Sequence, residues 1–420
     1  MKKELIKELI NANCIKFGNF ILKNGEVSKY YYDMKNLVSN PMLLKKVGDE
    51  LYNLLDDFDI ICGIPYGALP IATYISTQYN KPLIYIRDKQ KAYGTQKMIE
   101  GEYKKEDRCV IIDDVITSGK SLQDEIEKLK DKVNIVDVAV IMNRQQNPQC
   151  SIKFKSLLYK NDITKYLLTS ISEKKNSKLI FSADIPNYER IIEILEKIGK
   201  YIVACKIHSD MIDNIEEFIP KLIELSIKHN FLIMEDRKLN DISYIVNMQY
   251  KKFRNWVDLI TVHSLVTDDV LSVLSGALLV ANMSNNTYNF TEKALEMAEN
   301  NRNNVIGFIT QYKINCDEMV CMTPGISYSN TKIDDQKYRR KEEIDTDYII
   351  VGRAIYNSKV DEIEDKVKGM RQIARERGLA EPEKLKTMGR TEVLALLKAC
   401  PDIRGQRSML EECILSRGHL

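Results

Sequence analysis

The sequence predicts an α/β protein built from two units of parallel strands: a sheet with flanking helices, followed by a closed (β/α)8 barrel. Two observations predict this fold. Short apolar runs alternate with helical patterns through the first 160 residues, and from about residue 178 the same alternation can be counted to eight. A length of 420 residues is also typical of two or three domains.

Four short apolar runs carry the alternation in the N-terminal part. They are DIICGI (59–64), LIYIR (83–87), RCVIIDDV (108–115) and IVDVAVIM (135–142), and SLQDEIEKLKDK (121–132) has helical spacing. This βαβ order is typical of a parallel sheet that is covered by helices.

Eight further apolar runs follow, and helix-like stretches separate most of them. The runs span residues 178–184, 201–208, 231–238, 259–264, 276–284, 305–311, 319–325 and 347–353. Eight strand–helix units in roughly 185 residues predict a compact TIM barrel, a little below the usual size.

Polar residues, proline or glycine occupy the C-terminal ends of these eight runs. They are Asp184, Lys206, Asp236, Lys238, His263, Ser284, Gln311, Pro324, Gly325, Gly352 and Arg353. In (β/α)8 barrels the active site lies at this end and takes side chains from several strands. Solvation of the surface does not explain eight such ends on one rim, so we expect the barrel to be an enzyme.

The predicted domains are residues 1–160, a short linker helix at 161–176, the barrel at 177–365, and a helical tail at 366–420. The junction lacks a Gly/Pro linker, so we expect the two domains to lie close together. The tail is richer in arginine than the preceding chain and contains no asparagine, and its sequence indicates no function.

Composition excludes several classes of protein. A net charge of +2 provides no broad attraction to nucleic acid or membranes, and no apolar run approaches the ~18–20 residues that span a bilayer. The N-terminus lacks the apolar core of a signal peptide. Nine scattered cysteines without a CxxC pair favour reduced thiols in the cytoplasm and predict no structural metal site.

The segment CVIIDDVITSGKS (109–121) predicts a phosphate-binding loop. It reads as a strand, an acidic pair, a loop of small residues and the start of a helix. Backbone amides of Ile116 to Ser121 at the helix N-terminus would cradle a phosphate. Asp113 and Asp114 would then lie where a ribose offers two hydroxyl groups.

This segment resembles the loop that binds phosphoribosyl pyrophosphate (PRPP) in type I phosphoribosyltransferases. The wider resemblance, over about residues 5–160, is to the orotate phosphoribosyltransferases. It rests on FGNFILKNGEVSKYYYDM (17–34), GIPYGALPIAT (63–73), IRDKQKAYGTQKMIEG (86–101) and IMNRQQ (141–146). The resemblance implies orotate and PRPP as substrates.

The resemblance also implies a set of substrate contacts. They are Lys23, Tyr31, Tyr32, Arg87, Tyr93, Asp113, Asp114, Thr117, Ser118, Gly119, Ser121 and Arg144. Tyr31 and Tyr32 would line the orotate pocket, and Arg144 would hold the orotate carboxylate by a fork-shaped contact. Lys23 would contact the pyrophosphate and Arg87 the phosphate oxygens.

By the same resemblance, Lys91 is catalytic and stabilises charge on the leaving pyrophosphate in the neighbouring subunit's site. Mg²⁺ would arrive with PRPP and share this task, so no protein-held metal site is expected. Asp88 stands where the family usually has lysine, and Lys89 would replace it only after a one-residue shift. One alternative is therefore that only the C-terminal half is active.

The stretch FLIMEDRKLNDI in the C-terminal half carries an unusual concentration of charge. Residues i and i+2 of a strand point to the same face, so Asp236 and Lys238 share a face. Lys206 ends the preceding strand, and Asp241 lies in the loop beyond. The sequence therefore predicts an alternating Lys–Asp–Lys–Asp array at the barrel mouth.

From about residue 177 to 362 the chain resembles orotidine 5′-monophosphate (OMP) decarboxylases. The motifs are FSAD, CKIHSD, EDRKLNDI, ANMS, VIGFITQ, MTPGI and YIIVGRAI. In this order, the two halves resemble the bifunctional uridine 5′-monophosphate (UMP) synthase family. The resemblance implies that orotate and PRPP yield OMP, which is then decarboxylated to UMP without a cofactor.

The resemblance assigns roles to the charged array. Lys238 would stabilise the carbanion at C6 of the pyrimidine and protonate it, and Asp236 would lie near the substrate carboxylate. Lys206 and Asp184 would hold the ribose and orient the array. Asp241 would enter the partner subunit's site, which implies a homodimer with shared active sites.

The remaining decarboxylase contacts implied by the resemblance are His208, Ser284, Pro324, Gln336, Tyr338, Gly352 and Arg353. Ser284 would read the pyrimidine edge, whereas Gln336, Tyr338 and Arg353 would grip the 5′-phosphate. Ile245 departs from the family, which usually has a threonine there that contacts substrate across the dimer.

Several charged or polar neighbours have simpler structural explanations. Glu235 and Arg237 point to the other strand face, and His208 and His263 are most simply positioning or core residues. Two other functions stay open from sequence. A related barrel family uses a similar Asp-x-Lys-x-x-Asp array with Mg²⁺ on keto-sugar phosphates, and a non-catalytic nucleotide-binding or scaffold protein is the alternative from another class.

Overall fold

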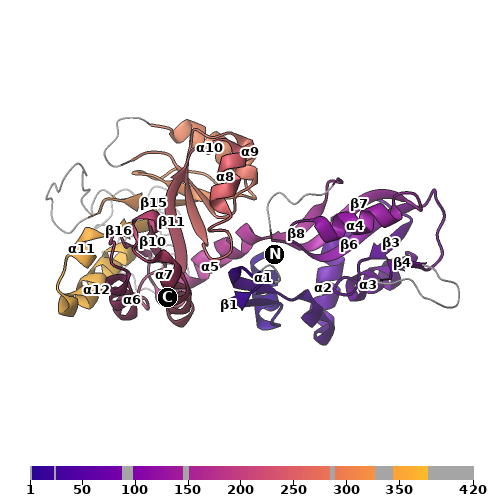
Figure 1. Ribbon diagram of the computed structural model, residues 1–420, viewed down its shortest axis with the longest axis horizontal. Helices are drawn as coiled ribbons and strands as arrows, with labels where there is room; N and C mark the ends of the chain where they lie inside the picture. Colours follow the sequence, from indigo (N-terminus) through magenta and orange to yellow (C-terminus); the bar gives the residue numbers. More distant parts are fainter. Residues whose placement is uncertain are drawn as a thin grey trace, which may run out of the picture.

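The computed structural model describes residues 2–22, 25–87, 98–144, 151–283, 289–326 and 344–376. Figure 1 shows the N-terminal part and the barrel side by side, with α5 (Lys160–Lys175) between them. None of the helices in the described ranges is long and apolar enough to cross a membrane.

The N-terminal part contains a six-stranded sheet in the order β5-β4-β3-β6-β7-β8. Its strands are β3 (Ile60–Gly63), β4 (Leu83–Ile86), β5 (Ile99–Glu100), β6 (Arg108–Ile116), β7 (Asn134–Asn143) and β8 (Lys155–Tyr159). Only the edge pair β4–β5 is antiparallel. The predicted parallel sheet is confirmed, and its four predicted strands are β3, β4, β6 and β7.

Helices cover both faces of this sheet. They are α1 (Lys2–Asn11), α2 (Pro41–Tyr52), α3 (Leu69–Tyr79) and α4 (Lys120–Leu129), with the 3₁₀ helix η1 (Met34–Ser39) before α2. Alternation along β6 divides the core: Val110 and Ile112 pack with α1 to α3, whereas Cys109 and Ile111 pack with α4. Burial on both faces explains why β6 begins as a continuous apolar run.

A separate two-stranded antiparallel hairpin completes the N-terminal part. It consists of β1 (Ile15–Ile21) and β2 (Val27–Tyr32), and among the described residues it makes no strand pairing with the six-stranded sheet. β1 lies against α7 (Ile215–His229) of the barrel.

The C-terminal part is a closed barrel of eight parallel strands, which confirms the predicted TIM barrel. The strands are β9 (Leu179–Ser182), β10 (Ala204–Ile207), β11 (Leu232–Leu239), β12 (Leu259–His263), β13 (Ala277–Val280), β14 (Val305–Ile309), β15 (Val320–Pro324) and β16 (Tyr348–Val351). Most are shorter than the predicted apolar runs.

Helices surround the barrel. Besides α7 they are α6 (Tyr188–Ile198), α8 (Ser243–Tyr250), α9 (Asp268–Ser272), α10 (Thr291–Asn300), α11 (Arg353–Tyr356) and α12 (Val360–Glu376), with the 3₁₀ turn η2 (Ser209–Met211). The apolar core fills the layer between these helices and the strands. The tail segments expected to be helical beyond residue 376 lie outside the described residues.

The helix expected at the junction, α5, closes the N-terminal end of the barrel. Leu168 and Ile171 of α5 pack into the interior cluster with Val203 and Leu232. Asn161 of α5 accepts from the backbone of the loop before β13 and donates to the backbone of β14. The N-terminal end of the barrel is therefore filled by α5, and the open end is the C-terminal one.

Candidate active sites

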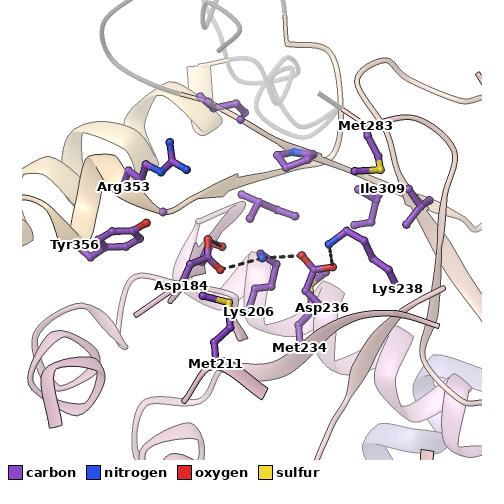
Figure 2. A pocket seen from close by; sticks show the side chains of 17 residues that line it. Asp184, Lys206, Met211, Met234, Asp236, Lys238, Met283, Ile309, Arg353 and Tyr356 are labelled. Atoms are coloured by element: carbon purple, nitrogen blue, oxygen red, sulfur yellow. Dashed lines mark hydrogen bonds and ion pairs between the residues drawn. The ribbon is translucent and has the colours of Figure 1, made fainter. Parts of the chain in front are cut away.

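Four side chains form an alternating charged chain at the C-terminal end of the barrel (Figure 2). The Lys206 ammonium lies 2.7 Å from Asp236 Oδ2 and 3.3 Å from Asp184 Oδ1. Lys238 Nζ donates to the other oxygen, Asp236 Oδ1, at 2.7 Å. The structure thus joins the predicted Lys206, Asp236 and Lys238, and Asp184 extends their array.

The strand order of the barrel explains this meeting. Neighbouring strands β9, β10 and β11 place the group, with Asp184 just after β9, Lys206 in β10 and Asp236 in β11. Lys206 is paired in register with Met234, so Asp236 lies one inward-facing layer higher. The long lysine side chain spans that layer.

Lys238 reaches Asp236 through an irregular end of β11. Its φ is +49°, in the left-handed region, and the pairing of β11 with β12 is irregular between Glu235 and Leu239. Thr261 of β12 holds this turn, because its Oγ1 accepts from the Lys238 amide at 2.9 Å and donates to Asp236 Oδ1 at 2.8 Å. Sequence reasoning missed Thr261, although a hydroxyl within the apolar run LITVH was a signal for it.

The site is buried enough that neighbouring charges set the pKa values of Asp236 and Lys206. Burial by itself would raise the pKa of Asp236, but the ammonium groups of Lys206 and Lys238 outweigh it and hold that pKa well below its usual range. Burial lowers the pKa of Lys206, and Asp236 and Asp184 outweigh this effect and raise it. Asp236 and Lys206 therefore stay charged at neutral pH and hold each other in place.

Two histidines border the array. His208 Nε2 lies 3.2 Å from the Lys206 ammonium, and burial and that charge lower the pKa of His208. Burial, followed by the charge of Lys238, also lowers the pKa of His263. Both imidazoles are therefore neutral at pH 7, so they add no positive charge beside the ammonium groups of the array.

Glu235 and Arg237 face away from the array toward η2. Glu235 is fully buried and accepts from the amide and hydroxyl of Ser209, and Arg237 pairs with Asp210 at 2.6 Å. Burial raises the pKa of Glu235 to about 7. These contacts attach the loop after β10 to the outside of β11.

A pocket of about 350 Å³ opens above the array. Its wall combines the four charged side chains with a mainly apolar lining of Met211, Met234, Val280, Met283, Ile309, Ile326 and Ile350. Arg353 and Tyr356 lie across the pocket from Lys238 (Figure 2). The size and composition suit a small molecule with an anionic group at each end.

The predicted residues divide into three groups. Those that line the pocket are Asp184, Lys206, Asp236, Lys238, Pro324, Gly325, Gly352 and Arg353. Asp241 is exposed on a loop, and Gln311 donates to the Pro324 carbonyl at 3.4 Å outside the lining. Ser284, Gln336 and Tyr338 lie outside the described residues.

Two further pocket residues were missed by sequence reasoning. Ser182 Oγ donates to Asp184 Oδ2 at 2.9 Å and so orients that carboxylate. Tyr356 follows Arg353 on the next helical turn and shares its side of the pocket. Neither residue carries a charge that would single it out in the sequence.

The predicted phosphate loop of the N-terminal part connects β6 to α4. Gly119 precedes α4 with a φ of +80°, a conformation that glycine adopts without strain. Thr117, Ser118 and Ser121 surround this turn, and Ser118 and Ser121 are exposed. The turn leaves the first amides of α4 at the rim of the sheet, as an anion site requires.

A second loop meets the acidic pair at the same edge. Residues 64–68 follow β3, which is parallel and adjacent to β6. A Cβ added to Gly67 would lie 1.9 Å from Asp114 Oδ2, so only glycine permits this approach. Burial, followed by the charge of Asp114, raises the pKa of Asp113 to about 7.

The residues expected to bind orotate lie at the interface with the barrel. Arg144 follows β7, and its Nη2 donates to Ser28 Oγ at 3.0 Å and to Asn255 Oδ1 of the barrel at 3.3 Å. Tyr32 presents a buried hydroxyl that has no hydrogen-bond partner among the described residues. Tyr31, next to it on β2, is exposed.

The remaining transferase predictions concern phosphate contacts. Arg87 directly follows β4 and pairs with Glu100 of β5 at 2.5 Å. Lys23, Lys91 and Tyr93 lie outside the described residues, as does the unusual Asp88.

Family models match both parts of the chain. Residues 33–159 match the phosphoribosyl transferase domain, and residues 177–365 match the orotidine 5′-phosphate decarboxylase / HUMPS family. These two ranges correspond to the six-stranded sheet and the barrel.

Curated relatives match along nearly the whole chain. Uridine 5′-monophosphate synthase of Naegleria gruberi is 30% identical, with 86% of this chain and 93% of that protein covered. The synthase of Bos taurus is 28% identical, with 84% and 93% covered. Orotate phosphoribosyltransferase of Pyrococcus abyssi is 40% identical over 158 residues, which are 36% of this chain and 87% of that protein. The chain belongs to the uridine 5′-monophosphate synthase family.

Proposed function

We propose that the chain makes UMP in two consecutive steps. Orotate and PRPP give OMP and pyrophosphate, and OMP then loses carbon dioxide to give UMP. The observation that carries the proposal is the buried array of Lys206, Asp236 and Lys238 in a pocket with Arg353 on the opposite side. The family supports both activities in one chain.

The array fits decarboxylation because of where charge develops. Loss of carbon dioxide leaves an electron pair on C6 of the pyrimidine, which the ring cannot delocalise. Lys238 Nζ, already fixed by Asp236, would stabilise this pair and then donate a proton to C6. Asp236 would lie against the departing carboxylate, where two like charges disfavour the bound substrate relative to the transition state.

Arg353 supplies the contact for the other end of the substrate. It follows β16 and lines the pocket with Gly352. A guanidinium at this position would hold the 5′-phosphate in two hydrogen bonds, and binding energy from this remote group would lower the barrier at C6. Ser284, Gln336 and Tyr338 are proposed to complete the contacts.

The transferase step is assigned to the edge where the two loops meet. Asp113 and Asp114 would bind the ribose hydroxyls of PRPP, and the amides before α4 would bind its 5′-phosphate. In the described ranges, no group of three or more His, Cys, Asp or Glu side chains could hold a metal ion. Mg²⁺ bound to PRPP needs no such group, because phosphate oxygens and water supply most of its ligands.

The proposed homodimer is supported by the surface beside Asp241. That carboxylate is exposed, and its Oδ1 accepts only from the next backbone amide among the described contacts. Ile242, Tyr244, Met248 and Leu265 are exposed apolar side chains on α8 and on the loops after β11 and β12. A second copy would cover this face and receive Asp241 in its own pocket.

We also propose a cytoplasmic location. The six cysteines in the described residues are free thiols, and five of them are buried. Reduced, scattered cysteines are typical of proteins in reducing compartments.

The division into domains at 1–160, 177–365 and 366–420, with α5 between the first two, is also a proposal.

A coupled assay tests the two-step function. The purified chain is incubated with orotate, PRPP and Mg²⁺, and release of carbon dioxide and UMP is measured. We expect both products. Folded protein that releases neither from these substrates nor from OMP contradicts the proposal.

Supplying OMP directly separates the remaining possibilities. UMP from OMP alone, with none from orotate and PRPP, would leave only the decarboxylase active, as Asp88 makes conceivable. We expect EDTA to leave decarboxylation of OMP unchanged. Loss of that activity on chelation would favour the Mg²⁺-dependent barrel chemistry instead.

A further inference from the structure

The hairpin β1–β2 is anchored to the barrel through one buried carboxylate. Asp258 is 1% exposed and directly precedes β12. Its Oδ2 accepts from the Lys29 ammonium at 2.7 Å, and its Oδ1 accepts from the Tyr30 hydroxyl. Lys29 is itself buried, so breaking this pair would leave an uncompensated charge in the interface.

A second contact joins the barrel to Arg144. Asn255 Oδ1 accepts from Arg144 Nη2 at 3.3 Å, and the Asn255 carbonyl accepts from the Lys29 amide at 3.0 Å. The Asn255 side-chain NH2 group donates to Glu26, so the side-chain oxygen of Asn255 is the end that faces Arg144. Ser28 supplies the other acceptor for the guanidinium.

The hairpin needs this support. A two-stranded sheet is marginally stable by itself, and in the described part of the chain this one makes no strand pairing with the six-stranded sheet. The Tyr30 ring packs in the apolar core of the N-terminal part while its hydroxyl reaches the barrel. The barrel therefore fixes the position and orientation of β2, which carries Tyr32.

We propose that Asn255 and Asp258 of the barrel are positioning residues for phosphoribosyl transfer. Asn255 holds the Arg144 guanidinium, and Asp258 holds β2, in the geometry that receives orotate. The decarboxylase barrel thus completes the orotate pocket of the transferase within the same chain. This inference rests on the proposed role of Arg144 and Tyr32 in binding orotate.

The burial of Arg144 explains why the acceptor matters. Arg144 is partly buried, and this burial lowers the pKa of its guanidinium. A partly buried guanidinium needs a hydrogen-bond acceptor for each N–H group that does not face the substrate. Without Asn255 Oδ1, the guanidinium is free to turn toward Glu26 and away from the orotate site.

Steady-state kinetics of the full-length chain test the proposal. Asn255→Leu removes the acceptor at nearly the same volume, and Asn255→Gln keeps both the acceptor oxygen and the NH2 group that donates to Glu26. We expect Asn255→Leu to raise the KM for orotate about tenfold or more and to change the KM for PRPP and OMP decarboxylation less than about twofold. Asn255→Gln should keep the orotate KM within about threefold of the original.

Two further variants keep the test interpretable. Tyr30→Phe removes only the hydroxyl that reaches Asp258, and we expect it to raise the orotate KM in the same selective way. Lys251→Ala changes an exposed side chain of the same barrel segment and should leave every constant unchanged.

The outcomes separate the two levels of inference. An orotate KM unaffected by Asn255→Leu, in a chain where Arg144→Gln raises it, overturns the positioning role. Equal damage to transfer and decarboxylation overturns it too, because it indicates a general structural defect. A parent chain that makes no OMP from orotate and PRPP contradicts the proposed function instead.

Discussion

Lys238 holds its ammonium in place at some conformational cost. A non-glycine residue in the left-handed region is less stable by about 1 kcal/mol or more. The hydrogen bond that the Lys238 backbone amide donates to Thr261 Oγ1 and the ion pair with Asp236 compensate for that cost. The sequence predicted the shared face of Asp236 and Lys238 from strand alternation, but not the turn or Thr261, which depend on a neighbouring strand.

Lys238→Ala should abolish decarboxylation and leave phosphoribosyl transfer intact. The change removes the only group proposed to meet the C6 electron pair, so we expect kcat on OMP to fall by at least about 10³-fold. Transfer from PRPP to orotate should proceed, and OMP should accumulate. Retained decarboxylation within about tenfold would contradict the role given to Lys238.

Thr261→Val should slow decarboxylation without weakening substrate binding to the same degree. The valine keeps the shape but loses the hydroxyl that links Lys238 to Asp236. We expect kcat on OMP to fall about 10- to 100-fold with a smaller change in KM. Thr261→Ser retains the hydroxyl and should recover most of the activity; equal effects from both variants would point to packing alone.

Glu235 makes the stability of the barrel depend on pH. Its folded pKa, about 7, lies above the ordinary glutamate value of 4.5, so the unfolded chain releases this proton first as pH rises. The free energy of unfolding should therefore fall between about pH 4.5 and 7, by up to about 3 kcal/mol from this group.

Glu235→Gln should remove that part of the pH dependence. Urea unfolding, followed by fluorescence of the single tryptophan, Trp256, measures the midpoint at each pH. Glu224→Gln, an exposed change on α7, is the control. Parallel midpoint curves for the parent and both variants would show that burial of Glu235 does not set this dependence.

At the scale of elements, local pattern predicted which segments become strands but not where they end. The run 201–208 becomes β10 only from Ala204 to Ile207. Ile202 is fully buried, but it packs against neighbouring elements before the strand pairing begins. Apolar composition reports burial, whereas strand ends depend on backbone pairing with neighbours.

Gly67→Ala should weaken the transferase alone. The added methyl group would overlap Asp114 and push the loop after β3 away from the acidic pair. We expect the KM for PRPP to rise about tenfold or more, with decarboxylation of OMP unchanged as a control for folding. An unchanged PRPP KM would show that this approach has no part in binding.

For the whole molecule, contacts between distant segments are what the sequence could not supply. Lys29 and Asp258 are separated by 229 positions, and neither residue stands out in its local pattern. The short junction did predict that the two parts lie close together. The side of the barrel that meets the hairpin became visible only in three dimensions.

Mixing two inactive variants tests the shared site of the proposed dimer. Lys238→Ala and Asp241→Ala chains are each expected to decarboxylate poorly, since each dimer lacks one essential group in both pockets. Exchange of subunits creates mixed dimers with one intact pocket, so an equal mixture should recover about a quarter of the original activity. No recovery after confirmed subunit exchange would contradict the lending of Asp241.

The transferase part contacts the N-terminal end of the barrel, through Asp258 and α5, while the decarboxylase pocket opens at the C-terminal end. Within one chain, OMP must therefore leave into bulk solvent and diffuse around the barrel to be consumed. Its steady-state concentration is then set by the ratio of its production rate to the capture efficiency of the decarboxylase. Rapid capture, rather than a tunnel, would protect this intermediate from phosphatases.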